Sequence, residues 1–153
     1  MGFPEDTALG VERHNVVIGI VGSRRRDTQE DFEQCEKTFL DVYNPGDTIV
    51  SGGCPKGGDR FAEILAKKYN VPIRIHYPDK SQLDQDLLNK NPRAAYAKIN
   101  YARNTLIAQD ADILLAVVAS DRKGGTEDTV KKAEKMGKRI ILVSPSSDNI
   151  FSI

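Results

Sequence analysis

Glycine, serine and arginine gather in three short segments that have the residue types of an anion site. The segment 22–24 (Gly-Ser-Arg) follows an apolar run, four glycines lie within 52–58, and a third segment, 124–126, reads Gly-Gly-Thr. Glycine exposes backbone N–H groups, arginine supplies charged donors, and the start of a following helix favours negative charge. We therefore predict a phosphate-binding or ligand-binding site that contains Gly22, Ser23, Arg24, Gly52, Gly53, Gly57, Gly58, Asp59, Gly124, Gly125 and Thr126.

Each segment also has a purely structural interpretation. The arginines of the first segment can be solvated, and Asp59 or Thr126 can serve only to cap the helix that follows it. In the third segment, Glu127 and Asp128 would compete with a phosphate for the positive end of the same helix. We therefore expect the first two segments to bind phosphate and the third to contact a sugar or a base.

The remaining candidate residues do not complete a nucleotide-hydrolase, acid–base or metal-binding motif. A P-loop NTPase needs a lysine and a hydroxyl residue after its glycines, but Asp59 and Arg60 stand there instead. His76 ends an apolar run and is a candidate acid or base, although a lone histidine in a strand is more often structural. Cys35 and Cys54 form neither a Cys-x-x-Cys site nor a disulfide framework, so we predict no metal site.

The elements that must position these residues follow from the apolar pattern. Five runs rich in Val, Ile and Leu have the composition of strands buried on both faces, and helical spacing fills each gap between them. This alternation predicts right-handed crossovers and a three-layer α/β/α sandwich around a mainly parallel five-stranded sheet. Ligands bind such sheets beyond the carboxyl ends of the strands, where the three segments fall. The predicted strands are 16–22, 48–53, 72–77, 112–119 and 139–143, and the predicted helices are 27–43, 59–69, 92–109 and 126–136.

Several local features refine this picture. Asp27 and Glu30 have the spacing of a capping box, and Gly137 has the position of a glycine that ends a helix. The polar stretch 78–91 is predicted to be a solvated loop, with a flap over the site as the alternative. We expect one domain over 15–145, an N-terminal extension over 1–14 and a C-terminal tail over 146–153.

Composition narrows the classes of partner. The 153 residues contain 22 basic and 22 acidic side chains, so the formal net charge is zero. A dedicated nucleic-acid-binding protein usually has a basic excess, and a membrane span needs about 20 consecutive apolar residues, which the chain lacks. We therefore expect a cytoplasmic protein whose partner is a small molecule rather than a membrane or a nucleic acid.

The ordered set of motifs resembles the SLOG superfamily, and within it the YspA-like branch, which is related to the LOG phosphoribohydrolases and the DprA proteins. The resemblance implies a Rossmann-like fold, a bound nucleotide or nucleotide derivative, a homodimer, and two further ligand-binding residues, Arg103 and Asn104. From the sequence alone, Arg103 could equally be a solvated residue in mid-helix. The motifs that carry the resemblance are Gly22-Ser23-Arg24, Ser51-Gly52-Gly53 with Gly57, Asp59 and Arg60, Arg103-Asn104 with Ala111-Asp112, and Gly125-Thr126.

Two functions remain open. The first is a binding module that senses or sequesters a nucleotide-like ligand. The second is an N-glycoside hydrolase of nucleoside 5′-monophosphates, with Glu127 as the catalytic carboxylate, Asp128 as the second choice and Arg103 on the phosphate. The LOG enzymes carry a catalytic glutamate at the position of Thr129, so their chemistry does not transfer directly. Binding of single-stranded DNA is a third and weaker interpretation.

Overall fold

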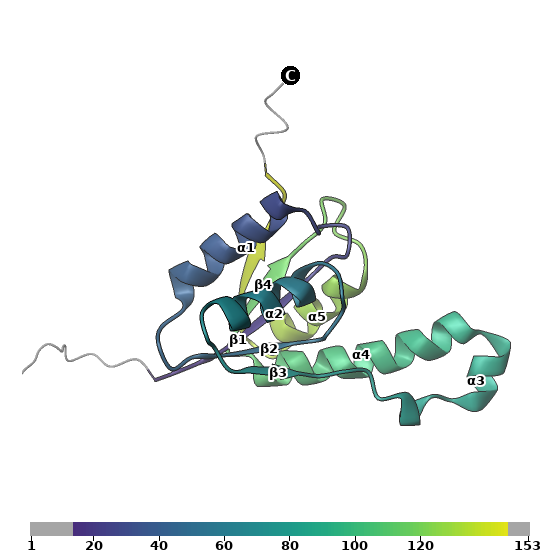
Figure 1. The fold of residues 1–153 in the computed structure, drawn as a ribbon. Coiled ribbons are helices and arrows are strands. Elements are labelled where there is room, and N and C mark those ends of the chain that lie inside the picture. The colour runs from purple at the N-terminus through teal and green to yellow at the C-terminus, as the bar shows by residue number, and fades with distance from the viewer. Residues whose placement is uncertain (1–13, 147–153) are drawn as a thin grey trace, which may run out of the picture.

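Five parallel strands form one sheet in the order β3-β2-β1-β4-β5 (Figure 1). The computed structural model describes residues 14–146, so the predicted extensions lie outside it except for residues 14 and 146. The prediction of a five-stranded parallel sheet is confirmed, and 73–75 forms an edge, as the alternating pattern of 72–77 indicated. The strands are β1 (Val17–Gly22), β2 (Thr48–Ser51), β3 (Ile73–Ile75), β4 (Ile113–Val117) and β5 (Arg139–Val143).

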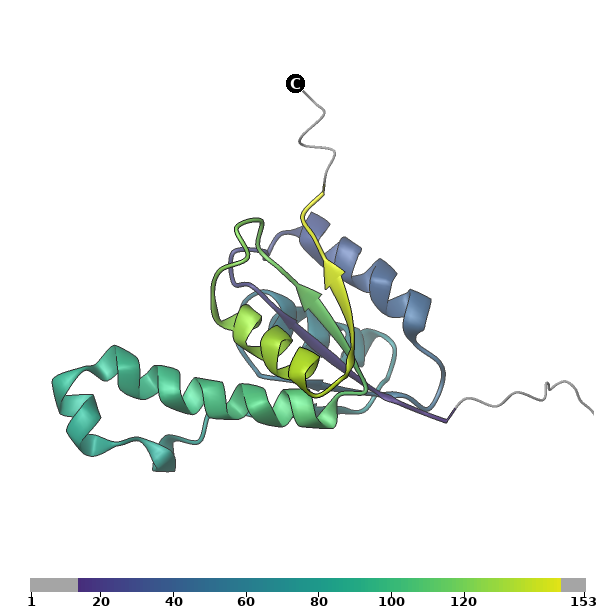
Figure 2. The ribbon, with the colours of Figure 1, turned by 180° about the vertical axis from the view of Figure 1, so that it is seen from behind.

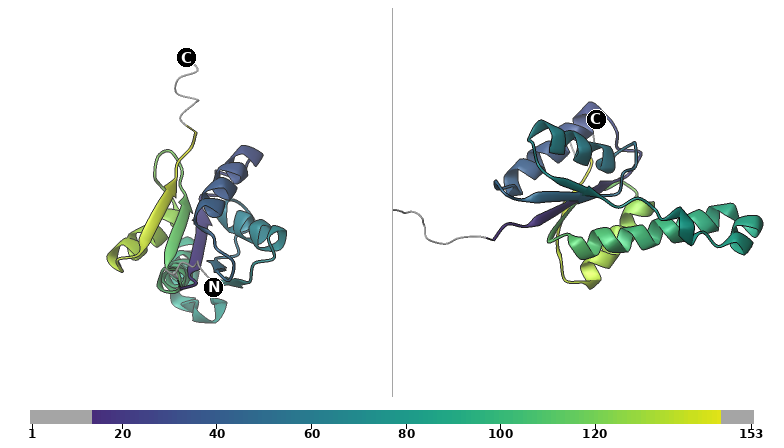
Figure 3. Two further views of the ribbon diagram at one scale, coloured as in Figure 1. Left: turned by 90° about the vertical axis from the view of Figure 1, so that its left-hand side faces the viewer. Right: turned by 60° about the horizontal axis from the view of Figure 1, so that its bottom comes forward.

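Helices cover both faces of the sheet. Figure 3 shows α1 and α2 on one face and α4 and α5 on the other, which confirms the three-layer sandwich. The sheet order places β1 and β4 side by side at its centre, where the direction of winding reverses. The helices are α1 (Gln29–Val42), α2 (Gly58–Lys68), α3 (Gln85–Lys90), α4 (Pro92–Asp110) and α5 (Gly125–Lys135), with a short 3-10 turn, η2 (Lys80–Gln82).

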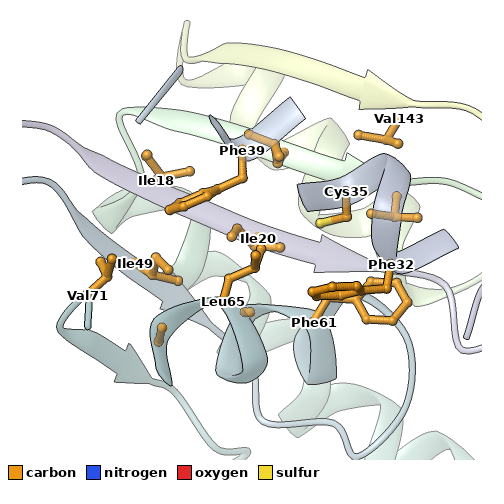
Figure 4. Close-up of a cluster of buried hydrophobic side chains, with 14 of the residues drawn as sticks. Ile18, Ile20, Phe32, Cys35, Phe39, Ile49, Phe61, Leu65, Val71 and Val143 are labelled. Carbon is orange, nitrogen blue, oxygen red and sulfur yellow. The ribbon is translucent and has the colours of Figure 1, made fainter. Parts of the chain in front are cut away.

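The apolar core lies in two layers, one on each side of the sheet. Under α1 and α2, Phe39 and Phe61 are fully buried against Ile20 (Figure 4). On the opposite face, Leu114 of β4 packs in a cluster with Ile107 of α4. Every residue of β4 is buried, as expected for a central strand that is covered on both sides.

The capping residue of α1 lies one residue later than the sequence predicted, and the helix begins at Gln29 rather than at residue 27. The capping box joins Thr28 and Asp31, with N–H to side-chain oxygen distances of 3.1 and 3.2 Å, and not Asp27 and Glu30. The Asp27 carboxylate instead accepts a hydrogen bond from the N–H of Gly57. A contact with a residue 30 positions away therefore takes Asp27 out of the cap.

The prediction of a loop over 78–91 is wrong. This stretch contains η2 and α3, and it returns along the first turns of α4 to form a helical arm that projects from the body (Figures 1 and 2). Side chains of Asp84 and Asn91 cap the two helices, and Pro92 starts α4 at the position where proline is best tolerated. None of the residues 78–91 lines the cavity described below, so the arm does not cover the site.

Within residues 14–146 we find no helix whose length and apolar character would let it cross a membrane.

Candidate anion-binding site

A cavity of about 590 Å³ opens at the carboxyl ends of β1 and β4. This is the position at which open α/β sheets bind ligands. Nine predicted site residues line it: Gly22, Ser23, Arg24, Asp59, Arg103, Asn104, Gly124, Gly125 and Thr126. The structure therefore brings together the first segment, the third segment and the Arg103-Asn104 pair.

The sequence analysis missed several residues of the cavity wall. Ala97, Asn100 and Tyr101 come from α4: Asn100 and Tyr101 lie four and three residues before Asn104, and Ala97 lies one further turn before them. That spacing places residues on one face of a helix, so it could have identified them. Cys54, Lys123 and Thr129 also line the cavity without having been predicted as ligand-binding residues.

The glycines of 52–58 lie outside the cavity and have structural surroundings. The N–H of Gly57 donates to Asp27 at 2.7 Å, so it is not free to bind an anion. A side chain on Gly58 would collide with the backbone of Val21 and Gly22. Gly53 lies against the ring of Tyr77, which a Cβ would approach to 2.5 Å. These glycines allow close packing at the start of α2, and the open cradle expected from their density is not formed here.

The start of α5, which the sequence analysis expected to contact a sugar or a base, has unoccupied backbone donors at the cavity. The N–H groups of Gly125 and Thr126 donate to no other described residue. The two acids that should compete with an anion are already paired. Arg122 holds Glu127 through two hydrogen bonds of 2.7 Å, and Lys132 holds Asp128 at 2.8 Å. The positive end of the helix is therefore available to a ligand.

The three consecutive arginines have three different surroundings. Arg26 is only 4% exposed and donates to backbone oxygens of Val118 and Val143. Arg25 joins the loops after β1 and β4 by binding Asp121 at 2.7 and 2.9 Å. The side chain of Arg24 makes no hydrogen bond or salt bridge within 14–146, and it lines the cavity. Of the three, only Arg24 is free to bind a ligand.

Arg103 is the second guanidinium at the cavity. It donates to the Gly52 carbonyl at 2.5 Å and to Asn104 at 2.9 Å. Burial lowers the pKa of Arg103, nearby Asp59 raises it, and the positive charge of Arg24 lowers it again. The alternative of a solvated mid-helix arginine is therefore wrong, because this side chain is half-buried beside another cation.

Asp59 is buried and lines the cavity. Burial raises its pKa above the ordinary value, although the Cys54 N–H, Arg103 and the Ser51 hydroxyl act in the opposite direction. Its two oxygens accept from Ser51 at 3.0 Å and from Cys54 at 3.1 Å.

The helix cap expected of Asp59 is absent, because α2 begins at Gly58 and Gly57 occupies the cap position. Likewise, Thr126 lies inside α5 and Gly124 occupies its cap position.

The Asp59 pKa leads to a prediction about Asp59→Asn. A carboxyl group whose pKa is raised by folding binds more protons in the folded state than in the unfolded state, so its contribution to stability falls as pH rises from the ordinary pKa through the raised one. Asparagine cannot ionise; its amide oxygen can still accept from the Cys54 N–H, and its NH2 group can donate to the Ser51 hydroxyl oxygen. We expect the unfolding free energy of the variant, relative to wild type, to increase from acid to neutral pH in urea titrations. A difference that stays constant with pH would contradict this account.

The remaining predicted residues lie away from the cavity. Glu127 is paired with Arg122 and does not line it. His76 does not line it either, and its Nε2 lies 2.6 Å from the Asp110 carboxylate. Between residues 14 and 146, no group of three or more His, Cys, Asp or Glu side chains is placed to hold a metal ion.

Comparison with known proteins shows the fold. No protein-family model and no curated protein matches the chain, so membership of the YspA-like branch stays a prediction. The structure is similar to the molybdenum cofactor binding protein of the phototrophic bacterium Rippkaea orientalis, with a TM-score of 0.61 and 22% identity over 92% of this chain and 85% of that one. It is also similar to the molybdenum cofactor carrier protein of Chlamydomonas reinhardtii, with a TM-score of 0.59 and 19% identity over 90% of this chain and 83% of that one. The chain shares the Rossmann-like fold of these two proteins.

Proposed function

We propose that the chain is a binding module for a small molecule that carries a phosphate group, such as a nucleotide or a phosphorylated pterin. The observation that carries the proposal is the pair of guanidinium groups at one cavity, where Arg24 is close enough to lower the pKa of Arg103. A bound phosphate would relieve this repulsion between like charges. The free N–H groups of Gly125 and Thr126 supply further donors at the same cavity.

The rest of the cavity suits the organic part of such a ligand. Its volume of about 590 Å³ lies within the usual range for small-molecule pockets. On the α4 wall, Tyr101 is 48% exposed and Asn100 carries an amide, so stacking and hydrogen bonding to a heterocycle are both possible. The neighbours in fold are described as proteins that bind or carry the molybdenum cofactor. A small-molecule ligand at this cavity agrees with those descriptions.

The hydrolase alternative receives no support from the site. Its carboxylate, Glu127, is held by Arg122 outside the cavity. The acids that do line the cavity are also engaged, since Asp59 binds Ser51 and Cys54, and Asp121 binds Arg25. We therefore propose binding, and not glycoside hydrolysis, as the function of this site. The homodimer implied by the resemblance stays a prediction.

Lys123 provides a direct test of the proposal. Its side chain lines the cavity and makes no hydrogen bond or salt bridge within 14–146. We expect Lys123→Met to weaken the binding of AMP and of inorganic phosphate about twofold to fivefold, the upper part of the range for one exposed charge contact. Calorimetric or NMR titration at fixed ionic strength measures both, and a pterin phosphate and ADP-ribose complete the set of probes.

Lys135→Met is the matched control, because Lys135 is exposed at the far end of the same helix. It should leave every affinity unchanged. If the wild-type chain binds none of these probes at millimolar concentration, the proposed function is wrong. If both lysine variants lose affinity equally, the anion is attracted by overall charge and not by this cavity.

A further inference from the structure

Thr129 has a buried hydroxyl group with no partner among the described residues. The residue is 1% exposed and lines the cavity, as Val21 and Ile107 do. Its side chain forms no hydrogen bond with any other described residue. Threonine in a helix can donate to the carbonyl four residues earlier, but Thr129 makes no such bond, and the Gly125 carbonyl accepts the side-chain amide of Asn104 at 3.4 Å.

An unpaired buried hydroxyl is costly for a folded protein. Native structures leave few buried polar side chains without a partner, and the exceptions often lie at functional sites. The other buried polar groups nearby follow this rule, since Ser51 donates to the Ile20 carbonyl and Asn104 bonds with both Arg103 and Asp128. Thr129 is therefore a buried side-chain group at this cavity that a ligand would satisfy.

The position of Thr129 relative to the anion site limits what that ligand is. Thr129 lies one turn after Gly125 on the same face of α5, about 6 Å along the helix axis from the N–H groups at its start. A phosphate at the start of the helix would thus place the next part of its ester, and not a second phosphate oxygen, beside the hydroxyl. Hydroxyls and ring oxygens are groups that Thr129 could pair with there.

We infer that Thr129 is a specificity-determining residue that hydrogen-bonds an oxygen of the ring bearing the phosphate. The ligand class is then a phosphate ester on an oxygen-bearing ring, such as a sugar phosphate, free or within a larger molecule. This inference rests on the proposed function, because it takes the phosphate to lie at the start of α5. It goes further by separating such esters from inorganic phosphate and from simple alkyl phosphates.

The test uses Thr129→Val, which keeps the shape and removes the hydroxyl, and Thr129→Ser, which keeps the hydroxyl. The probes are ribose 5-phosphate, n-butyl phosphate and inorganic phosphate, titrated by NMR so that millimolar affinities are measurable. We expect Thr129→Val to lose about tenfold in affinity for ribose 5-phosphate and nothing for the other two probes. Thr129→Ser should bind all three like wild type.

Stability of the ligand-free variant gives a second readout. Valine removes an unsatisfied buried hydroxyl, so Thr129→Val should melt at the same temperature as wild type or higher. A lower melting temperature would show that the hydroxyl has a structural role and would overturn the inference. Equal affinity of wild type and Thr129→Val for ribose 5-phosphate would also overturn it, as would equal losses for all three probes. If wild type binds no probe, the proposed function fails, whereas binding of all three with equal affinity defeats only this inference.

Discussion

Replacing Gly58 by alanine should destabilise the chain by about 3 kcal/mol, whereas the same change at Gly125 should be nearly neutral. Both glycines are the first residue of a helix, α2 and α5 respectively. A Cβ on Gly58 would meet backbone atoms of Val21 and Gly22, which cannot move away as a flexible side chain could. A Cβ on Gly125 has no atom within 4 Å.

The two variants form a matched pair, because alanine changes helix propensity equally in both. Gly125→Ala should stay within about 0.5 kcal/mol of wild type, or gain slightly as the unfolded chain loses freedom. Urea unfolding measures both free energies. If Gly58→Ala were as stable as wild type, the backbones of α2 and β1 would have to separate at little cost, and our structural explanation of the 52–58 glycines would be wrong.

This comparison also shows why the sequence misled us about the second segment. A dense group of glycines predicts close approach to the backbone, but it does not say what approaches. At Gly58 the approaching group is the end of β1, and at Gly57 it is the Ser23 carbonyl. At Gly125 the space is open and borders the cavity. Local sequence cannot separate these cases, because the neighbours come from distant parts of the chain.

The fold was more predictable than the site. Buried parallel strands need long apolar runs and amphipathic helices need a 3.6-residue period, so both leave a pattern in consecutive residues. Gly137 was also placed correctly, since its φ of 72° is the left-handed conformation that ends α5. The arm over 78–91 left only a weak pattern, because none of its residues is buried. Its capping residues, Asp84 and Asn91, were the signal that could have identified it.

The arginine run provides the prediction with the largest expected contrast. Arg26→Met should cost about 3–5 kcal/mol of unfolding free energy, the usual effect of removing one member of a buried ionic network. Its guanidinium binds the Asp31 carboxylate at 3.0 Å, the Gln34 side chain, and carbonyls at the ends of β4 and β5. Methionine leaves those buried oxygens without a donor. Arg24→Met removes a side chain with no such contacts and should change stability by less than about 0.5 kcal/mol.

The variant expected to leave stability almost unchanged, Arg24→Met, is the one expected to lose phosphate binding. We expect Arg24→Met to weaken the binding of inorganic phosphate and AMP about tenfold to a hundredfold, the range for a hydrogen bond to a charged group. Arg25→Met should have a small effect on stability, since its pair with Asp121 is exposed. NMR titration and urea unfolding of the same three proteins separate the two properties. Loss of binding without loss of stability at Arg24 would assign the cavity to a phosphate ligand, whereas unchanged binding there would remove the main support for the proposed function.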